Sequence, residues 1–180
     1  MCGICGFVTK KEIKIDCLRK MNQTMVHRGP DDYGEELYSI GGGWTAGFGH
    51  RRLSIMDLSE KGHQPMHSYD KRVSVVYNGE IYNFGMLKQE LSDYPFTTRC
   101  DTEIILAAYL KWGIGFIEKL NGMFAIALLD RENDTLFLWR DRIGKKPLFY
   151  YSDNESNFVF GSEFKALISY PGIQREVNKE

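Results

Sequence analysis

The stretch Met123-Phe-Ala-Ile-Ala-Leu-Leu129 decides the fold class. It is apolar at every position, so both alternating faces of an extended strand built from it are apolar. Strands of a sheet that faces solvent on one side alternate between apolar and polar residues instead. The stretch therefore predicts a strand that is covered by packed elements on both of its faces.

Shorter runs with strand character lie on both sides of this stretch and are bounded by Gly, Asp, Asn or Lys. Together with the central run they cover residues 3–8, 44–50, 73–78, 123–130, 135–139, 147–151 and 158–160. Between two of them, the triplet Gly41-Gly-Gly43 predicts a tight turn. Because the strands cluster without strict alternation with helices, they favour an α+β fold with antiparallel sheets over a doubly wound parallel sheet.

Helical spacing is found in four places. Asp16 is a candidate N-cap for a helix that carries Leu18, Met21 and Met25 on one stripe. Asp101 or Thr102 is a candidate N-cap for a longer helix that runs to Trp112 and is stopped by Gly113. Shorter helices are expected within residues 85–91 and 163–169.

Length and charge limit the kinds of function. The 180 residues fit one domain with a sizeable core. The 23 basic and 24 acidic side chains leave a formal charge of −1, which argues against a nucleic-acid or anionic membrane partner. No uninterrupted apolar run reaches the length of a membrane span, and residues 1–15 turn polar too soon for a signal peptide. We therefore expect a cytoplasmic protein that binds neither nucleic acid nor a membrane.

Cys2 stands directly after the initiator methionine. If Met1 is removed, one residue carries both a thiol, with a pKa near about 8.5, and an α-amine, with a pKa of about 7.7–8.0. Such an amine can take the thiol proton and later return it to a leaving group, so one residue supplies nucleophile and base. Position alone leaves a second interpretation open, a buried cysteine at the start of a strand.

Cys2-Gly-Ile-Cys5 also has the spacing of a redox or zinc motif. A redox motif should open a helix after a strand, whereas this one begins the chain. A zinc site needs two further ligands, and His63 and His67 lie far beyond the usual spacing of about 12–15 residues. We expect no metal site, and the Cys2/Cys5 redox or zinc module remains an alternative.

Polar residues follow several strands and suit an amino-acid substrate. Arg52 ends one strand, and an arginine fork can hold an α-carboxylate. Asn78 and Gly79 follow another and offer the two donors that a tetrahedral oxyanion requires, although Asn-Gly is also a common turn. Asp101 can pair with an ammonium group or simply cap its helix. The glycines carry neither a P-loop nor a dinucleotide fingerprint, so nucleotide binding is poorly supported.

Taken together, these segments resemble class II glutamine amidotransferases, and in particular the glutaminase domain of asparagine synthetases. The resemblance covers nearly the whole chain in family order. It rests on Cys2-Gly-Ile-Cys-Gly-Phe7, His27-Arg-Gly-Pro-Asp31, Arg52-Leu-Ser-Ile55, Gln64-Pro-Met66, Asn78-Gly-Glu-Ile-Tyr-Asn83, Asp101-Thr-Glu103, Leu120-Asn-Gly-Met-Phe-Ala125, Arg140-Asp-Arg-Ile-Gly-Lys-Lys-Pro-Leu148 and Ser162-Glu-Phe-Lys-Ala-Leu167.

The resemblance implies an N-terminal-nucleophile hydrolase fold, a four-layer αββα sandwich of two mainly antiparallel sheets. It implies that Cys2 attacks the side-chain amide of glutamine and that Asn78 and the N–H of Gly79 form the oxyanion hole. The remaining matches are substrate-binding positions: Arg52, rather than Arg51, for the carboxylate, Glu80 and Asp101 for the ammonium group, and Leu53 and Ile55 for backbone contacts.

The implied reaction is hydrolysis of glutamine to glutamate and ammonia, with no cofactor in this domain. Ammonia would pass to an ATP- and Mg²⁺-dependent synthetase domain or partner subunit, a ligase of asparagine biosynthesis when the acceptor is aspartate. We expect residues 1–180 to be a single glutaminase domain without that synthetase domain, as a fragment or a separate subunit, and a homodimer is one possible assembly. An attached Met1 would block the mechanism, and a non-catalytic glutamine-sensing module is the main alternative.

Overall fold

The computed structural model describes residues 1–54, 59–154 and 157–173. Its strands form two sheets in which all neighbouring strands run antiparallel. The five-stranded sheet has the order β2 (Asp32–Ile40), β3 (Trp44–Arg52), β1 (Gly3–Thr9), β9 (Phe158–Gly161) and β8 (Phe149–Ser152). The four-stranded sheet has the order β4 (Met66–His67), β5 (Val73–Ile81), β6 (Gly122–Asp130) and β7 (Thr135–Arg140).

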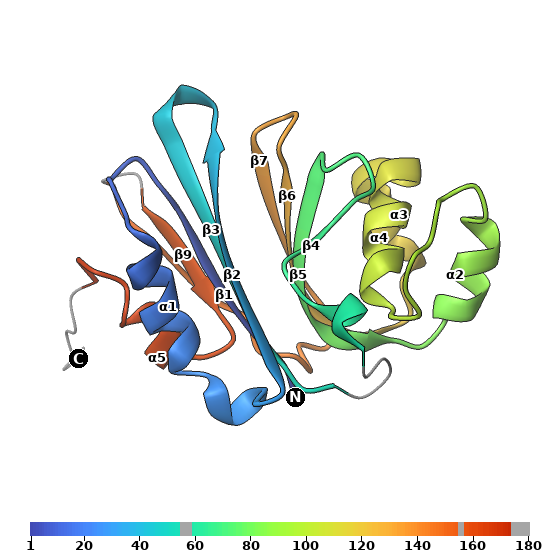
Figure 1. The fold of residues 1–180 in the computed structure, drawn as a ribbon, viewed down its shortest axis with the longest axis horizontal. Coiled ribbons are helices and arrows are strands. Elements are labelled where there is room, and N and C mark those ends of the chain that lie inside the picture. The colour runs from blue at the N-terminus through green and yellow to red at the C-terminus, as the bar shows by residue number, and fades with distance from the viewer. Residues whose placement is uncertain (55–58, 155–156, 174–180) are drawn as a thin grey trace.

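The two sheets face each other, and helices cover their outer faces (Figure 1). The five-stranded sheet is covered by α1 (Ile15–Gln23) and α5 (Phe164–Leu167), and the four-stranded sheet by α2 (Phe84–Glu90), α3 (Thr102–Trp112) and α4 (Phe116–Lys119). Short 3-10 helices are η1 (Val26–Arg28), η2 (Gly41–Gly43), η3 (Glu60–Gly62) and η4 (Gly113–Gly115). The expected α+β class and the four-layer αββα sandwich are confirmed.

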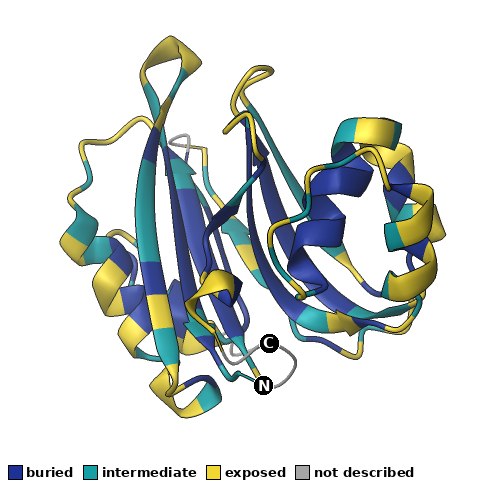
Figure 2. Ribbon diagram, turned by 45° about the vertical axis from the view of Figure 1, so that its right-hand side comes forward, coloured by how far each residue is buried: buried dark blue, intermediate teal, exposed yellow. Residues whose placement is uncertain are grey.

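The strand β6 has the two apolar faces that its sequence predicts. Ala125, Ala127 and Leu129 pack between the two sheets, in a cluster with residues of the five-stranded sheet. The intervening side chains, Phe124 among them, pack in a second cluster with residues of α3. Figure 2 shows the dark blue of buried residues running along the strands of both sheets. Alternation along one strand therefore joins the inter-sheet core to the core beneath the helices.

Several features differ from expectation, and the short elements β4 and α4 were not predicted. The edge strand β2 was not predicted, because acidic residues such as Glu35 and Glu36 hide its alternation. Helix α1 begins at Ile15 and has Lys14 at its N-cap position, so the prediction of Asp16 as the cap is wrong. Asp16 lies instead in the first turn, where it forms an ion pair with Arg19 at 2.9 Å. Its negative charge there also interacts favourably with the positive N-terminal end of the helix dipole.

Other local expectations are confirmed. Helix α3 runs from Thr102 to Trp112, with Asp101 at its N-cap position. The Gly41–Gly43 segment joins β2 to β3, and Gly42 and Gly43 have φ angles of 68° and 76°, which glycine adopts without strain. The start of β1 and the end of β3 pair with each other, because Gly3 lies opposite Arg51. This edge of the sandwich carries most of the candidate site residues.

Candidate functional site

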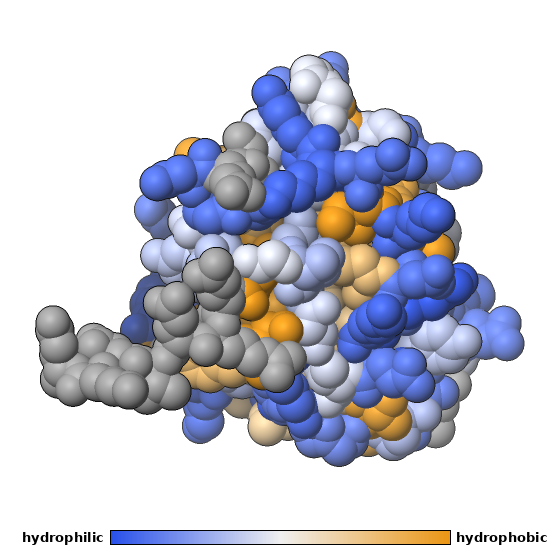
Figure 3. Space-filling model, turned by 90° about the vertical axis from the view of Figure 1, so that its left-hand side faces the viewer, coloured by the Kyte–Doolittle hydropathy of each residue, from blue (hydrophilic) through white to orange (hydrophobic). Residues whose placement is uncertain are grey.

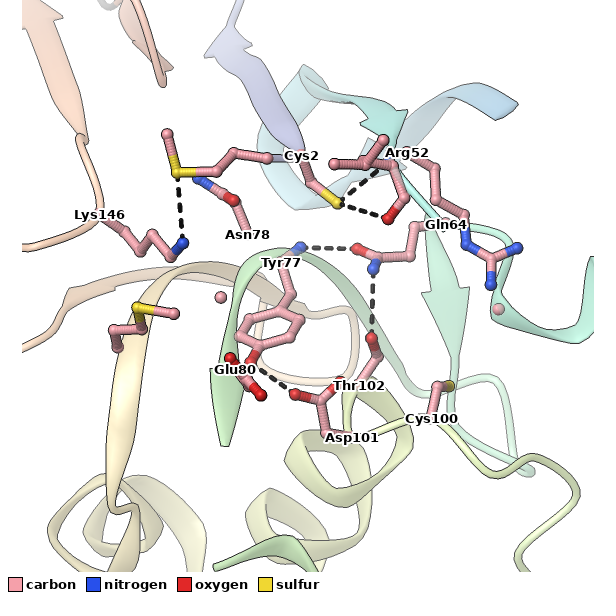
Figure 4. Close-up of a pocket in the computed structure, with 15 residues that line it drawn as sticks. Cys2, Arg52, Gln64, Tyr77, Asn78, Glu80, Cys100, Asp101, Thr102 and Lys146 are labelled. Carbon is pink, nitrogen blue, oxygen red and sulfur yellow. Dashed lines mark hydrogen bonds between the residues drawn. The ribbon is translucent and has the colours of Figure 1, made fainter. Parts of the chain in front are cut away.

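A cavity of about 230 Å³ lies where β1 begins and where β3 and β5 approach their ends (Figure 4). That volume suits a small metabolite rather than a drug-sized ligand. The cavity brings together all the predicted site residues that the structure describes, whereas Ile55 lies outside the described residues. Its lining is Met1, Cys2, Arg52, Leu53, Gly62, Gln64, Tyr77, Asn78, Gly79, Glu80, Cys100, Asp101, Thr102, Met123 and Lys146.

Leu53 and Arg28 hold Cys2 in place, the first through contacts with its sulfur and the second through its carbonyl oxygen. Its Sγ atom lies 3.4 Å from the N–H of Leu53, which donates to it, and 3.7 Å from the carbonyl oxygen of the same residue. The Nε atom of Arg28 donates to the Cys2 carbonyl oxygen at 2.9 Å. Leu53 therefore contacts the thiol through its main chain. No role was predicted for Arg28, although it belongs to the segment His27-Arg-Gly-Pro-Asp31 that carries the family resemblance.

Glu163 holds Arg28 in place. Its carboxylate accepts from Arg28 at 3.1 Å and from His27 at 2.8 Å. Burial alone would raise the pKa of Glu163, but the hydrogen bonds from His27, Arg28 and Lys165 outweigh it and lower the pKa to about 2. An ionised carboxylate behind the arginine thus fixes the main chain of Cys2, and this support joins η1 to the segment just before α5.

Asn78 and Gly79 lie inside β5 rather than in a turn. Asn78 is 1% exposed, and its Nδ2 atom has no hydrogen-bond partner among the described residues. A buried donor without a partner is costly, so its presence at a cavity wall points to a ligand atom that accepts from it.

The backbone of β5 turns a second donor toward the cavity. The N–H groups of Tyr77 and Ile81 donate to side chains, Gln64 at 2.7 Å and Asp101 at 3.0 Å. Successive N–H groups of a strand point to opposite edges, so the N–H of Gly79 points the same way as these two. A Cβ atom on Gly79 would lie 2.3 Å from the Met123 carbonyl oxygen, so the chain tolerates only glycine here.

Arg52 is 7% exposed, and its guanidinium donates to the carbonyl oxygen of Ser59 at 2.8 Å. It passes so close to Gly62 that a Cβ atom there would lie 2.0 Å from a guanidinium nitrogen. Arg51 points elsewhere, since it donates to the Asn22 carbonyl oxygen at 3.3 Å and lies over the ring of Tyr33. Of the two arginines, Arg52 is therefore the one that lines the cavity.

The carboxylates Glu80 and Asp101 both line the cavity, and neighbouring groups position Asp101. Asp101 makes no side-chain cap bond to α3. Its Oδ2 atom accepts from the Tyr77 hydroxyl at 2.8 Å and from the Ile81 N–H. Burial raises the pKa of Asp101 even though these two hydrogen bonds act in the opposite direction. The Asp101 side chain is thus engaged with β5 rather than with its own helix.

Gln64 is a cavity residue for which no role was predicted. Its Oε1 atom accepts from the Tyr77 N–H, and its Nε2 atom donates to the Thr102 hydroxyl at 3.2 Å. One buried amide therefore joins β5 to the first residue of α3. Its only signal in the sequence was the stretch Gln64-Pro-Met66, which marked the family but named no contact.

Cys5 does not share the environment of Cys2. It is fully buried in a cluster with residues of α1 and α5, and burial strongly raises the pKa of its thiol. Both cysteines are free thiols. In the described parts of the chain, no three His, Cys, Asp or Glu side chains gather closely enough to hold a metal ion. The geometry gives no support to a joint Cys2/Cys5 redox or zinc site.

The comparison with known families matches residues 1–180 to a family described as the glutamine amidotransferase domain. The chain belongs to this family. The glutamine amidotransferase domain is 40% identical to glutamine-hydrolysing asparagine synthetase 2 of Bacillus subtilis, over 99% of this chain and 24% of that protein. It is 38% identical to asparagine synthetase B of Escherichia coli, over 93% of this chain and 30% of that protein. The expected class of glutamine amidotransferase is confirmed.

A solved structure shares the fold of this glutamine amidotransferase domain. It is the glutamine phosphoribosylpyrophosphate amidotransferase of Bacillus subtilis, with a TM-score of 0.75 and 19% identity over 93% of this chain and 43% of that one. The glutamine amidotransferase domain spans between 24% and 37% of the length of the first curated relatives that it matches. Within the described ranges, no helix has both the length and the apolar character needed to cross a membrane.

Proposed function

We propose that this glutamine amidotransferase domain hydrolyses glutamine to glutamate and ammonia, with Cys2 as the nucleophile after removal of Met1. The observation that carries the proposal is the pairing, in one cavity, of the Cys2 thiol with the unpartnered Nδ2 donor of Asn78. A thiol supplies the attacking atom of acyl transfer, and a fixed, otherwise unused donor suits the oxyanion that the attack creates.

In the first half of the reaction, the α-amine of Cys2 takes the thiol proton and the sulfur attacks the side-chain carbonyl carbon of glutamine. The carbonyl oxygen becomes an oxyanion, which Asn78 Nδ2 and the Gly79 N–H stabilise. When the tetrahedral intermediate collapses, the C–N bond breaks and the α-ammonium returns its proton to the leaving nitrogen. Ammonia leaves, and a thioester on Cys2 remains.

In the second half, water attacks the thioester carbon and the α-amine takes its proton. The same two donors hold the second oxyanion. Collapse breaks the C–S bond, releases glutamate and restores the thiol. One residue therefore acts as nucleophile, base and acid, and no metal or cofactor takes part in this sequence of steps.

The other cavity residues suit the charged end of glutamine. Arg52 offers a guanidinium for the α-carboxylate, and Glu80 and Asp101 offer carboxylates for the α-ammonium group. Leu53 would add a backbone contact, and we place Ile55 in the same role although it lies outside the described residues. Glutamate presents an anionic oxygen where glutamine presents its amide, so a site built for the amide rejects it through unpaired groups.

We further propose that the released ammonia serves a synthetase region that needs ATP and Mg²⁺, with aspartate as the default acceptor. The asparagine synthetases that this chain matches are about three to four times longer than the matched part, which leaves room for such a region in those proteins. The protein would then be a ligase of asparagine biosynthesis. The free thiols suit a reducing, cytoplasmic compartment, and a homodimer is a proposed assembly.

The test is glutamate release from glutamine by wild type, Cys2→Ala and Cys17→Ala, after intact mass has shown that Met1 is absent. Cys17 lies on α1, away from the cavity, and controls for loss of a thiol. We expect Cys2→Ala to lose glutamate release and Cys17→Ala to keep it. Equal rates in all three proteins would overturn the proposal, and saturable glutamine binding by a wild type without turnover would support a sensing module instead.

A further inference from the structure

Lys146 is a cavity residue for which the proposed steps have no use. It lies in the loop after β7, is only 6% exposed, and reaches into the cavity on the side of Asn78 (Figure 4). Its Nζ atom donates to the Sδ atom of Met1 at 3.4 Å. No acidic side chain of the described residues pairs with it. The cavity therefore contains a buried ammonium whose neighbour is a neutral thioether.

The fold fixes the main chain of Lys146 on both sides. Its N–H donates to the buried carboxylate of Asp141 at 2.9 Å, and its carbonyl oxygen accepts from the Nε atom of Arg140 at 2.7 Å. Asp141 also accepts from the N–H of Phe124 on β6 at 3.2 Å. These bonds tie the loop to the central strand, so the ammonium enters the cavity from a rigid support.

The other charges around Cys2 have partners or assigned uses. Arg28 from η1 is paired with Glu163, and Arg52 from β3 is bonded to a carbonyl oxygen. Asp101 before α3 accepts two hydrogen bonds, and Glu80 from β5 completes the set. Burying a cation without a counter-charge is unfavourable, so Lys146 needs an interaction that appears only when the site is at work.

Removal of Met1 changes the surroundings of Lys146 in a definite way. The thioether that its ammonium contacts departs, and the α-amine of Cys2 is created at the wall of the same cavity. During the reaction, negative charge forms there on two atoms, the Cys2 sulfur and the substrate oxygen. A fixed cation opposes protonation of the resting amine, which keeps the base available near neutral pH, and it favours both anions. When the amine takes the thiol proton, stabilisation of the thiolate offsets the cost of the new ammonium beside Lys146.

We propose, building on the proposed function, that Lys146 is a positioning residue that acts through its positive charge. Its ammonium keeps the α-amine of Cys2 neutral and stabilises the anions formed beside it. Lys146 acts through Cys2 and the oxyanion rather than by touching a substrate bond. The same charge placed on the surface would be screened by water and would have little influence on these groups.

The test compares Lys146→Met with Lys145→Met, which removes the same charge from the exposed neighbouring position. Glutamate release is measured from about pH 5 to about pH 9 on protein shown to lack Met1. For Lys146→Met we expect the acid limb of kcat/KM to move up by about one pH unit, because the amine gains its proton more readily without the nearby cation. At pH values below the wild-type limb, kcat/KM of Lys146→Met should therefore be about tenfold lower than that of wild type. Lys145→Met and Lys146→Arg should keep the wild-type profile.

A second readout separates this inference from the proposed function. The rate of Cys2 alkylation by iodoacetamide, followed through the mass of the N-terminal peptide, reports thiol ionisation without any turnover. We expect the midpoint of this rate against pH to rise in Lys146→Met and to stay unchanged in Lys145→Met. An unchanged midpoint in Lys146→Met, or an equal shift in Lys145→Met or Lys146→Arg, would overturn the role of Lys146. If wild type releases no glutamate, the proposed function fails and the alkylation curves alone decide on Lys146.

Discussion

At the scale of the residue, Asn78 presents a side-chain donor that no described group of the resting cavity uses. Removing that donor breaks no hydrogen bond of Nδ2 in the free protein. Its contribution should therefore appear only when an oxyanion forms. This separates Asn78 from Arg28 and Gln64, whose side chains hold other parts of the cavity in place before any substrate arrives.

We expect Asn78→Ala to lower kcat by about 10²–10³, with KM changed only a few-fold, because the donor acts on the transition state. The temperature of unfolding should change little. Steady-state kinetics and thermal unfolding of the same preparation check both parts. A loss of activity that merely follows a loss of folded protein would show that Asn78 has a structural role instead.

At the scale of the element, η3 fits against β3 through a glycine. The chain passes so close to Arg52 at Gly62 that any side chain there must displace the guanidinium. In helix α2, by contrast, a Cβ atom at Gly85 would meet nothing within 4 Å. The two glycines thus differ in what the same substitution does.

We expect Gly62→Ala to raise KM for glutamine about tenfold or more and to change kcat less, because it moves the proposed carboxylate-binding arginine. Gly85→Ala should leave the kinetics unchanged and stabilise the protein by about 0.5–1 kcal/mol, since alanine is the better helix former. Kinetics and denaturant unfolding of both variants check this. An unchanged KM in Gly62→Ala would count against the assigned role of Arg52.

Some features of the helices and strands could be predicted from the sequence, whereas contacts between distant segments could not. The two apolar faces of β6 and the span of α3 follow from local patterns, because hydrophobic periodicity is a short-range signal. The partnership of Arg28 with Cys2 and Glu163 joins positions far apart in the chain, and periodicity carries no information about it. Likewise, buried Lys146 follows exposed Lys145 in the sequence, and the two adjacent lysines carry no local signal that tells which one is buried.

At the scale of the whole molecule, a buried histidine of one sheet contacts the other sheet. His50 of β3 is fully buried, and its Nε2 atom lies 3.2 Å from the carbonyl oxygen of Tyr77 on β5. Burial lowers the pKa of His50 to about 3, although the hydrogen bond to Tyr77 acts the other way.

On the outer side of α1 and α5, the surface is mostly hydrophilic, with apolar residues in small separate patches (Figure 3).

The lowered pKa of His50 predicts how folding depends on pH. Unfolded histidine takes a proton near about pH 6.5, whereas folded His50 stays neutral down to a pH of about 3, so the unfolded state binds more protons between these values. This one group should therefore remove about 1.4 kcal/mol of stability for each pH unit of descent through that window.

The measurement is urea unfolding of wild type and His50→Gln at several pH values within the window. We expect His50→Gln to be less stable at neutral pH, where a buried contact is altered, but to lose less stability on acidification. Parallel curves for the two proteins would show that His50 does not cause the acid sensitivity.

The cross-sheet placement of the cavity has a consequence for substrate length. Arg52 belongs to one sheet and Asn78 to the other, so the packing of the sheets sets the span between the proposed carboxylate clamp and the oxyanion donors. Asparagine is one methylene shorter than glutamine, and it cannot reach both ends of a span fitted to glutamine. For the proposed substrate, the packing of the two sheets would therefore set which length of side-chain amide fits the cavity.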